Sequence, residues 1–203
     1  MSKVKKSVKP KPAKVAREIP TGITRILALD LSENSTGWCR FNVETGVALW
    51  GTISNTEKLL GSARLDFLVQ RVLELVAGEG AAPARSTFVA IENFSFGSTN
   101  RAHDIGMVHG VIRLMLYKNG FRTILIAPTL MKKWVTGKGS GDKNLILKYI
   151  DKRYGYDCDQ EDAADALGLM TLTRAFLGFH PGGDEAMVSF QTEALETLKL
   201  GKD

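Results

Sequence analysis

Two carboxylates of this sequence stand at the ends of short apolar runs, where a negative charge is costly. Asp30 lies at the end of the run RILALDL, and Glu92 lies just past the most apolar part of the run STFVAIENF. A carboxylate is expensive to bury among apolar side chains unless it is paired or bound to a cation. If the two runs form adjacent strands, Asp30 and Glu92 lie side by side. Two like charges at that separation resist joint ionisation unless a metal ion neutralises them.

A second pair of carboxylates lies in the stretch CDQEDAADALGL near the C-terminus. Asp162 and Asp165 are three residues apart, so a helix would present them on one face, and the neighbouring alanines let the helix start pack tightly. The candidate catalytic and metal-binding carboxylates are therefore Asp30, Glu92, Asp162 and Asp165. Oxygen ligands of this kind suit Mg²⁺ or Mn²⁺ and not zinc. Two such ions about 4 Å apart would stabilise both the attacking and the leaving oxygen in phosphodiester hydrolysis.

Each acidic feature also has a purely structural interpretation. Acids at a helix start complement the helix dipole and cap free N–H groups, which would account for Asp162. A buried arginine partner would account for Glu92. The combination of both features with Asp30 favours a metal site, and it predicts that two strand ends and one helix start meet in space.

Basic residues gather in the stretch between Lys132 and Arg153. Seven Lys and Arg stand there against two acids, and the segment TGKGSGDKN is rich in glycine. Glycines let a backbone approach a phosphate closely, and the N–H groups at the start of the next helix can point at it. The segment lacks the spacing of a P-loop, and a solvated turn is the alternative interpretation. Trp134 is interpreted as a core anchor in preference to a base-stacking residue.

The elements expected to position these residues follow a definite order. Hydrophobic periodicity predicts strands over 25–31, 36–43, 48–54, 86–94 and 121–128, and helices over 62–78, 101–120, 142–155 and 161–179. The first three strands form an antiparallel meander, and the later strands alternate with helices. This order predicts an α/β fold with a mixed central sheet flanked by helices. In the second helix, Gly106 and Gly110 permit close approach of the sheet or of a second subunit, while His103 and His109 are interpreted as structural.

The composition indicates one folded domain with two tails. The chain has 203 residues, 44% of them hydrophobic, which is enough for one core. We expect a basic disordered arm over 1–18, a folded domain over 19–180, and a C-terminal tail over 181–203 with a helix over 189–200. Residues 1–17 hold seven Lys and Arg and no acid. Such an arm binds phosphates without sequence preference, or it serves as a solubilising tail.

Composition also argues against several protein classes. The sequence has no run of 18 apolar residues, so no membrane span is expected, and its N-terminus lacks the apolar region of a signal peptide. Cys39 and Cys158 are too few for a disulfide framework or a Cys-based zinc site. We therefore expect a protein of a reducing, cytoplasmic compartment.

Four stretches resemble, in order, the motifs of RuvC-like Holliday junction resolvases, which belong to the RNase H-like nuclease superfamily. They are ILALDLSENSTGW, VAIENF, APTLMKKWVTGKGSGDKNLI and EDAADALGL, and the similarity covers residues 25–177. The resemblance implies an RNase H-like fold in which the four carboxylates bind two Mg²⁺ ions, for which Mn²⁺ would substitute. The sequence departs from the family at Asp30-Leu31-Ser32, where many members have Asp-Pro-Gly, so the turn after the first acid must differ.

The resemblance also implies one basic catalytic residue and a set of DNA contacts. Lys143 is implied to contact the scissile strand and to offset charge in the transition state. The implied DNA-binding residues are Lys132, Lys133, Lys138, Lys143, Phe94 and Phe96. The family places an aromatic residue after its second acid, near the junction centre, and spacing does not decide between Phe94 and Phe96.

The implied activity is that of a structure-selective DNA endonuclease acting on four-way junctions. It would make symmetric nicks with 5′ phosphates, as a homodimer whose two-fold axis matches that of the junction. A broader nuclease for forks, flaps and three-way junctions is one alternative, and RNase H-type cleavage of RNA–DNA hybrids is another. A non-catalytic junction-binding protein is the alternative from outside the enzymes.

Overall fold

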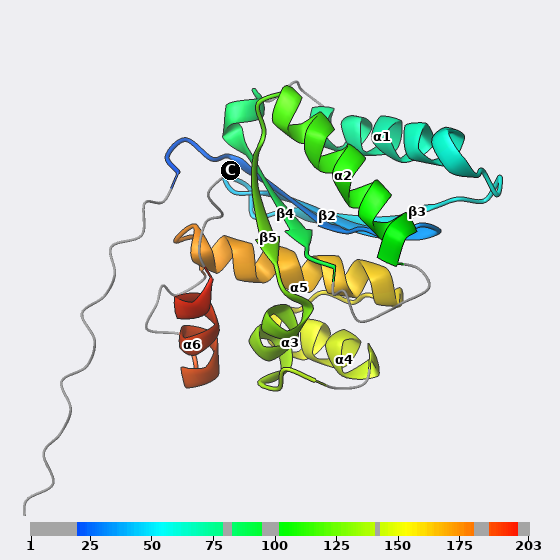
Figure 1. Cartoon of the computed structure of the whole chain (residues 1–203). Helices are drawn as coiled ribbons and strands as arrows, with labels where there is room; N and C mark the ends of the chain where they lie inside the picture. Colours follow the sequence, from blue (N-terminus) through cyan, green and yellow to red (C-terminus); the bar gives the residue numbers. More distant parts are fainter. Residues whose placement is uncertain (1–19, 79–82, 95–101, 141–142, 181–186, 199–203) are drawn as a thin grey trace, which may run out of the picture.

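The structure is a computed structural model that describes residues 20–78, 83–94, 102–140, 143–180 and 187–198. At the centre of this described part is a five-stranded sheet (Figure 1). Its strands are β1 (Arg25–Asp30), β2 (Ser35–Asn42), β3 (Ala48–Ser54), β4 (Thr87–Glu92) and β5 (Arg122–Ile126). They lie in the order β3-β2-β1-β4-β5, with antiparallel β1–β2 and β2–β3 pairs and parallel β1–β4 and β4–β5 pairs. The predicted mixed sheet is confirmed.

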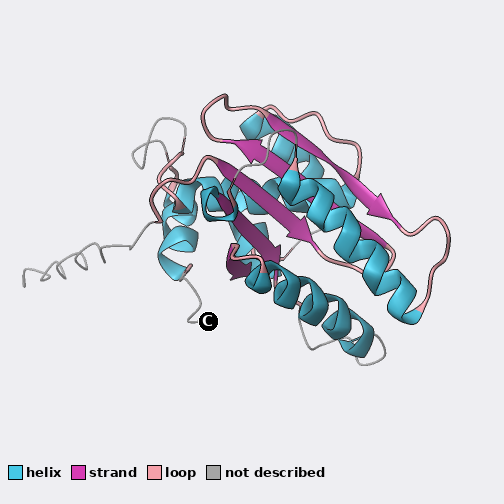
Figure 2. Ribbon diagram, turned by 90° about the horizontal axis from the view of Figure 1, so that it is seen from above, coloured by secondary structure: helices cyan, strands magenta, loops and turns pink. Residues whose placement is uncertain are grey.

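Helices cover both faces of this sheet (Figures 1 and 2). One face carries α1 (Gly61–Ala77) and α2 (Ala102–Lys118), and the short 3₁₀ turn η1 (Ala84–Ser86) precedes β4. The other face carries α3 (Pro128–Thr136), α4 (Lys143–Tyr154), α5 (Glu161–Phe176) and α6 (Ser189–Thr197). Of these four, α5 lies directly against β1 and β2, while α3 and α4 pack on α5, and α6 packs on α3.

The central strand β1 is apolar throughout because it is covered on both sides. Ile26 and Ala28 belong to the core beneath α5, whereas Leu27 and Leu29 belong to the core beneath α1 and α2. All four side chains are fully buried. A strand buried on both faces reads as a continuous apolar run, as is typical of strands with parallel neighbours. The apolar run RILALD therefore predicts a strand that is buried on both faces. It also marks Asp30, the charged residue at its end, as unusual.

Helix α3 was not expected from the sequence. Pro128, interpreted as the end of a strand, also occupies the first turn of a helix, where its missing N–H costs nothing. The helix ends at Gly137, whose φ of 85° is the left-handed conformation common at helix C-termini. Trp134 of α3 is fully buried and its indole N–H donates to Thr171 Oγ1 at 3.0 Å, so its interpretation as a core residue is confirmed.

The C-terminal segment contributes to the core through α6. This helix lies within the range expected for it, and Ala194 and Leu195 are buried together with residues of α3 and α5. The arm over 1–18 lies outside the described residues. None of the helices in the described ranges has the length and apolar character needed to cross a bilayer.

Candidate active site

The register of the sheet brings two of the predicted acids together. Leu29 of β1 pairs with Ile91 of the parallel strand β4. Asp30 and Glu92 are the next residue along each strand, so both stand at the carboxyl ends of adjacent parallel strands. This is the edge of an open α/β sheet where ligands commonly bind.

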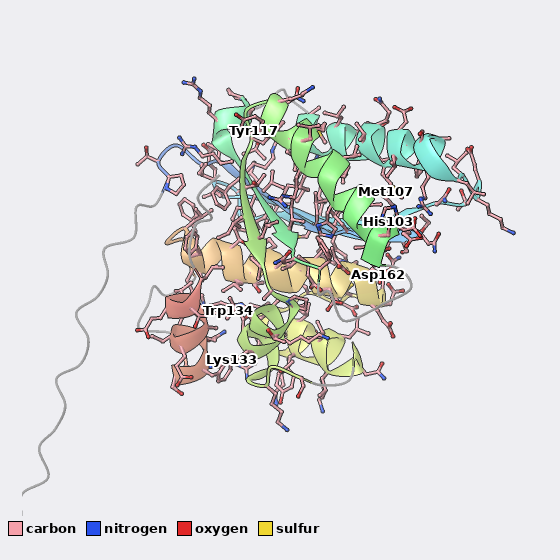
Figure 3. The ribbon with its side chains drawn as sticks, viewed as in Figure 1. His103, Met107, Tyr117, Lys133, Trp134 and Asp162 are labelled. Atoms are coloured by element: carbon pink, nitrogen blue, oxygen red, sulfur yellow. The ribbon has the colours of Figure 1, made fainter. Side chains whose placement is uncertain are left out.

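The start of α5 supplies the other two acids. Asp162 and Asp165 are half-buried, while Ala163, Ala164 and Ala166 are fully buried against the sheet and neighbouring helices. The predicted sharing of one helix face is thus confirmed. Figure 3 shows Asp162 at the end of α5 that lies on the same side of the molecule as the start of α2.

A glycine in β2 sets how closely α5 approaches the sheet. Gly37 pairs with Asp30 across the β1–β2 ladder. A Cβ atom at Gly37 would overlap the backbone carbonyl of Asp162, so only glycine fits at this contact. The backbone that carries Asp162 therefore lies directly over the strand residue opposite Asp30.

The surroundings of Glu92 disfavour its ionised form. Burial, followed by the negative charges of Asp30 and Asp165, raises its pKa to about 9, while the positive charge of Lys132 acts in the opposite direction. Its Oε2 atom is buried and has no hydrogen-bond partner among the described residues. A buried arginine does not supply one, because Arg64 bonds to Glu33 instead, at 3.2 Å. The ionised form of Glu92 thus requires a further positive charge.

Asp162 has a different environment. Its Oδ2 atom accepts a 2.6 Å hydrogen bond from the hydroxyl of Ser35. The N-cap residue of α5, Gln160, makes no side-chain capping hydrogen bond. The capping interpretation of this acidic stretch therefore does not account for the hydrogen bond that Asp162 makes.

The donor set fits a hard divalent cation in its chemistry. Carboxylate oxygens are the ligands Mg²⁺ prefers, and a buried, unpartnered carboxylate oxygen beside two other acids is stabilised by such a charge. Within the described ranges, however, no three acidic, His or Cys side chains are arranged so that they could hold one ion as they stand. Ion binding therefore requires these carboxylates to rearrange.

The predicted lysines point in different directions. Lys132 of α3 is half-buried and close enough to Glu92 for its charge to favour the ionised carboxylate. Lys133 instead forms a 2.9 Å ion pair with Glu193 of α6. Lys138 is exposed in the loop after α3, and Lys143 is the first residue of α4, with its side chain outside the described part.

The two phenylalanines also separate. Phe94 packs on the imidazole of His109, with ring centroids 4.9 Å apart, whereas Phe96 lies outside the described residues. Burial, followed by the charge of Arg113, lowers the pKa of His109 to about 4, so this histidine is neutral at ordinary pH. A neutral, buried His109 that supports Phe94 agrees with its structural interpretation.

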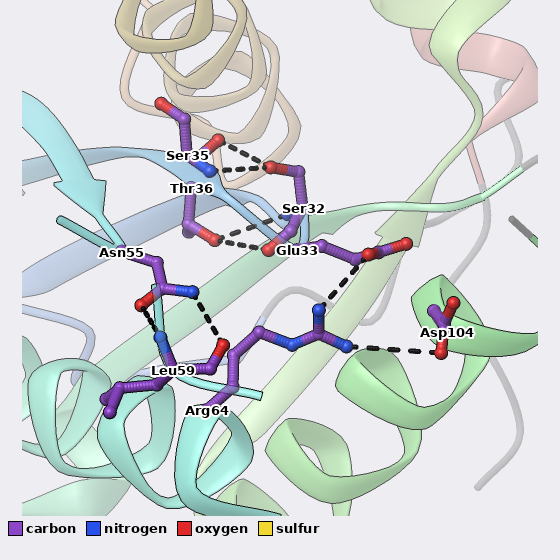
Figure 4. A network of polar contacts seen from close by, with 8 residues as sticks. All are labelled: Ser32, Glu33, Ser35, Thr36, Asn55, Leu59, Arg64 and Asp104. Carbon is purple, nitrogen blue, oxygen red and sulfur yellow. Dashed lines mark hydrogen bonds and ion pairs between the residues drawn. The ribbon is translucent and has the colours of Figure 1, made fainter. Parts of the chain in front are cut away.

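The turn between β1 and β2 leads to Ser35, a residue that the sequence did not single out and whose hydroxyl bonds to Asp162. Ser32, Ser35 and Thr36 bond to one another through their hydroxyl groups and backbones (Figure 4). Beside them, Arg64 of α1 joins Glu33 to Asp104 of α2, at 3.2 and 4.0 Å. The spacing Ser-x-x-Ser-Thr after the first acid is the signal that could have revealed a side-chain-bonded turn.

Glu92 gives a prediction for stability as a function of pH. Its pKa is about 9 when folded and about 4.5 when unfolded, so between these values the folded state holds the extra proton. Without divalent metal, the free energy of unfolding should fall as pH rises through this window, by up to about 1.4 kcal/mol per pH unit. Added Mg²⁺ should raise the melting temperature more near the upper end of the window than near the lower end. Thermal scans of wild type and Glu92→Gln would check this, and an equally steep fall in the variant would contradict it.

Comparison with known proteins places the chain in a family, although no protein-family model matches it. A RuvC crossover junction endodeoxyribonuclease from Azorhizobium caulinodans is 33% identical over 155 residues, which are 73% of this chain and 88% of the relative. The RuvC of Afipia carboxidovorans is 29% identical over 151 residues, covering 71% of this chain and 85% of the relative.

Solved structures agree with the sheet and helix arrangement. Thermus thermophilus RuvC superposes with a TM-score of 0.60 and 19% identity, over 76% of this chain and 97% of that one. The same protein in complex with a Holliday junction substrate matches with a TM-score of 0.60 and 17% identity, over 77% and 97%. These likenesses confirm the predicted RNase H-like fold. Together with the identity and coverage of its sequence relatives, they show that the chain belongs to the RuvC family of crossover junction endodeoxyribonucleases.

Proposed function

We propose that this protein is a divalent-metal-dependent endodeoxyribonuclease that resolves four-way DNA junctions. The observation that carries the proposal is the meeting of acids from β1, β4 and α5, with Glu92 buried and unbalanced among them. Its relatives are crossover junction endodeoxyribonucleases, and one structural neighbour is bound to a Holliday junction. We place its action in the cytoplasm of a bacterial cell or a phage-infected host.

The four acids would bind the cations in the proposed chemistry. Asp30, Glu92, Asp162 and Asp165 would hold the cation site. When bound there, two Mg²⁺ or Mn²⁺ ions supply a Lewis acid for water activation and charge neutralisation at the leaving 3′ oxygen, which leaves a 5′ phosphate. Glu92 would give up its proton on binding, because a cation favours its ionised form.

The basic residues would position DNA around this centre. Lys132 lies near Glu92 and would contact the scissile phosphate, while Lys143 at the start of α4 would offset charge in the transition state. Lys138, exposed in the loop after α3, would contact the backbone further out. Lys133 would have to leave Glu193 to bind a phosphate, so we expect a smaller contribution from it. The roles of Phe94 and Phe96 at the junction centre stay predictions.

Symmetric cleavage requires two active sites, and the outer face of α2 suits a second copy of the chain. Beyond their own helix backbone and chain neighbours, no heavy atom of the described residues lies within 4 Å of where a Cβ would stand at Gly106 or Gly110. Their open surroundings support the interpretation that they permit close approach of a second subunit. Leu114 and Tyr117 are 54% and 73% exposed on the same helix, and Figure 3 shows Tyr117 near its C-terminal end. An open apolar helix face of this kind is typical of a subunit interface.

Replacing Tyr117 with glutamate should therefore dissociate the dimer. A charge introduced into an apolar interface weakens association by at least about tenfold. Sedimentation velocity would report the change in mass, and junction cleavage should shift from paired cuts to single nicks. Val47→Glu, at an apolar residue 54% exposed before β3, is the matched control and should stay dimeric. A dimeric Tyr117→Glu would place the interface elsewhere.

The proposed function is tested by offering the wild-type chain a panel of labelled DNA substrates with Mg²⁺. A four-way junction should be cut at symmetric positions, each product carrying a 5′ phosphate, and a chelator should stop the reaction. Linear duplex, a flap, a fork, a three-way junction and an RNA–DNA hybrid would be compared at equal concentration. Equal cutting of all branched substrates would favour the broader nuclease, and preferred cutting of the hybrid an RNase H-type enzyme. Tight junction binding with no cutting in Mg²⁺ or Mn²⁺ would leave a binding protein.

A further inference from the structure

We propose that Ser35 is a positioning residue that fixes the carboxylate of Asp162 for cation binding. The inference rests on the proposed function, since it concerns the same site. It assigns a role to the turn after β1, where this chain has Leu-Ser in place of the Pro-Gly of many relatives.

The contact that carries the proposal is short and charge-assisted. Ser35 is the first residue of β2, and its Oγ donates to Asp162 Oδ2 at 2.6 Å. A hydroxyl has one proton to give, so this bond commits it to Asp162. One carboxylate oxygen of Asp162 is then held by the protein, and the hydrogen bond leaves its other oxygen available for a cation.

The turn before β2 fixes the serine itself. Ser32 Oγ donates to the carbonyl of Ser35 at 2.7 Å and accepts from the N–H of Ser35 at 3.0 Å. Thr36 Oγ1 donates to the carbonyl of Ser32 and accepts from its N–H, both at 3.2 Å (Figure 4). Two side chains thus close the turn in both directions. A turn closed by side chains holds its backbone without the proline that fixes φ in other members of the family.

Strand geometry then aims Ser35 at α5. Residues two apart on a strand face the same side of the sheet, so Ser35 and Gly37 face α5 together. Cys39 and Phe41 continue this row into the core beneath α5. Gly37 allows the start of the helix to approach, and Ser35 bonds to the side chain that arrives there.

The turn therefore links two of the predicted metal ligands through the chain. Asp30 precedes Ser32 by two residues, and the hydroxyl contacts run from Ser32 to Ser35 and on to Asp162. Polar partners of this kind orient ligating carboxylates, and their loss typically lowers metal affinity or activity about 10–100-fold. Without Ser35, the Asp162 carboxylate is free to rotate toward the open N–H groups of its own helix start.

The test compares Ser35→Ala and Ser35→Thr with wild type in two measurements. The first is the Mg²⁺ concentration that half-saturates single-turnover junction cleavage, and the second is the rise in melting temperature that Mg²⁺ causes without DNA. Ser35→Ala should need about 10–100-fold more Mg²⁺ in both, while its rate at saturating Mg²⁺ recovers. Ser35→Thr keeps the hydroxyl on a strand-compatible side chain and should restore the wild-type Mg²⁺ dependence.

Two controls separate orientation of the ligand from a general structural role. Ser54 of β3 pairs with Ser35 in the sheet but is exposed, so Ser54→Ala should change neither measurement. In an Asp162→Asn background, Ser35→Ala should cause no further loss of the Mg²⁺-induced melting shift, because the group it orients is gone.

The outcomes are distinct for the two proposals. A Ser35→Ala protein with wild-type Mg²⁺ dependence overturns the role of Ser35. The role of Ser35 is also overturned if Ser35→Ala lowers the metal-free melting temperature and the rate at saturating Mg²⁺ but leaves the half-saturating Mg²⁺ concentration unchanged. Wild-type protein that cuts no junction overturns the proposed function instead, and the melting shift with Mg²⁺ still decides the role of Ser35.

Discussion

Replacing Asp162 with asparagine should lower the rate of junction cleavage at least about 10³-fold while junction binding persists. The amide has the shape of the carboxylate but no charge to share with a cation. It lies on the face of α5 that also presents Asp165, at the edge where β1 and β4 end. Removing one negative charge from a DNA-binding surface does not weaken attraction to phosphates.

The measurement is single-turnover cleavage of a labelled four-way junction, with binding followed by mobility shift in Ca²⁺ or without metal. Asp159→Asn is the matched control, because Asp159 is an exposed acid just before α5 and the change removes the same charge. It should cut at the wild-type rate. An Asp162→Asn protein that cuts within about tenfold of wild type would remove Asp162 from the proposed metal site.

A Gly37→Ala substitution should damage stability and cleavage together. The added methyl group would overlap the backbone carbonyl of Asp162, and backbone cannot rotate away as a side chain can. Either β2 or the start of α5 must shift. Overpacking of this kind costs about 1–3 kcal/mol, and for a domain of this size each kcal/mol lowers the melting temperature by about 2–4 °C. Since the shift moves Asp162 and Asp165 relative to Asp30, cleavage should fall by more than the loss of folded protein explains.

Gly51→Ala offers a comparison within the same sheet. A Cβ at Gly51 would meet the edge of the Trp38 ring at 3.2 Å, and a side chain can yield where a carbonyl cannot. We expect a smaller change in melting temperature and wild-type cleavage for that variant. If Gly37→Ala melts and cuts as wild type does, then Gly37 does not set the approach of α5.

The sequence predicts that Asp30 and Glu92 lie side by side because each follows an apolar run and the two runs form adjacent strands. A carboxylate at the end of an apolar run lies at the end of a strand, and aspartates three residues apart lie on one face of a helix. Few arrangements of these carboxylates are then possible in a mixed sheet. The parallel pairing of Leu29 with Ile91 then places Asp30 beside Glu92. Burial of β1 on both faces follows from the same apolar run that marked it as a strand.

Features that depend on long-range contacts could not be predicted in the same way. Lys132 and Lys133 are neighbours in a basic stretch, and nothing local reveals that one lies near Glu92 while the other pairs with Glu193. Adjacent residues of a helix point in different directions, and α3 therefore places Lys132 and Lys133 in different surroundings. The sequence did not indicate α3, because Pro128 was interpreted only as the end of a strand. The bond from Ser35 to Asp162 joins residues 127 positions apart, so a local pattern shows the turn but not its target.

The hydrophobic core is divided into two clusters, one on each face of the sheet. On one face of the sheet, α5 packs against Gly37, and its Gly168 packs against Met131 and Val135 of α3. The helices that carry Asp162, Asp165 and Lys132 therefore form one tightly packed layer. The opposite face carries α2, which packs on α1 and β5 and is open at Gly106 and Gly110. If α2 forms the proposed subunit interface, substitutions at its outward-facing Leu114 and Tyr117 should change assembly without moving the carboxylates. The partner preference of such a protein could then be altered through one helix surface.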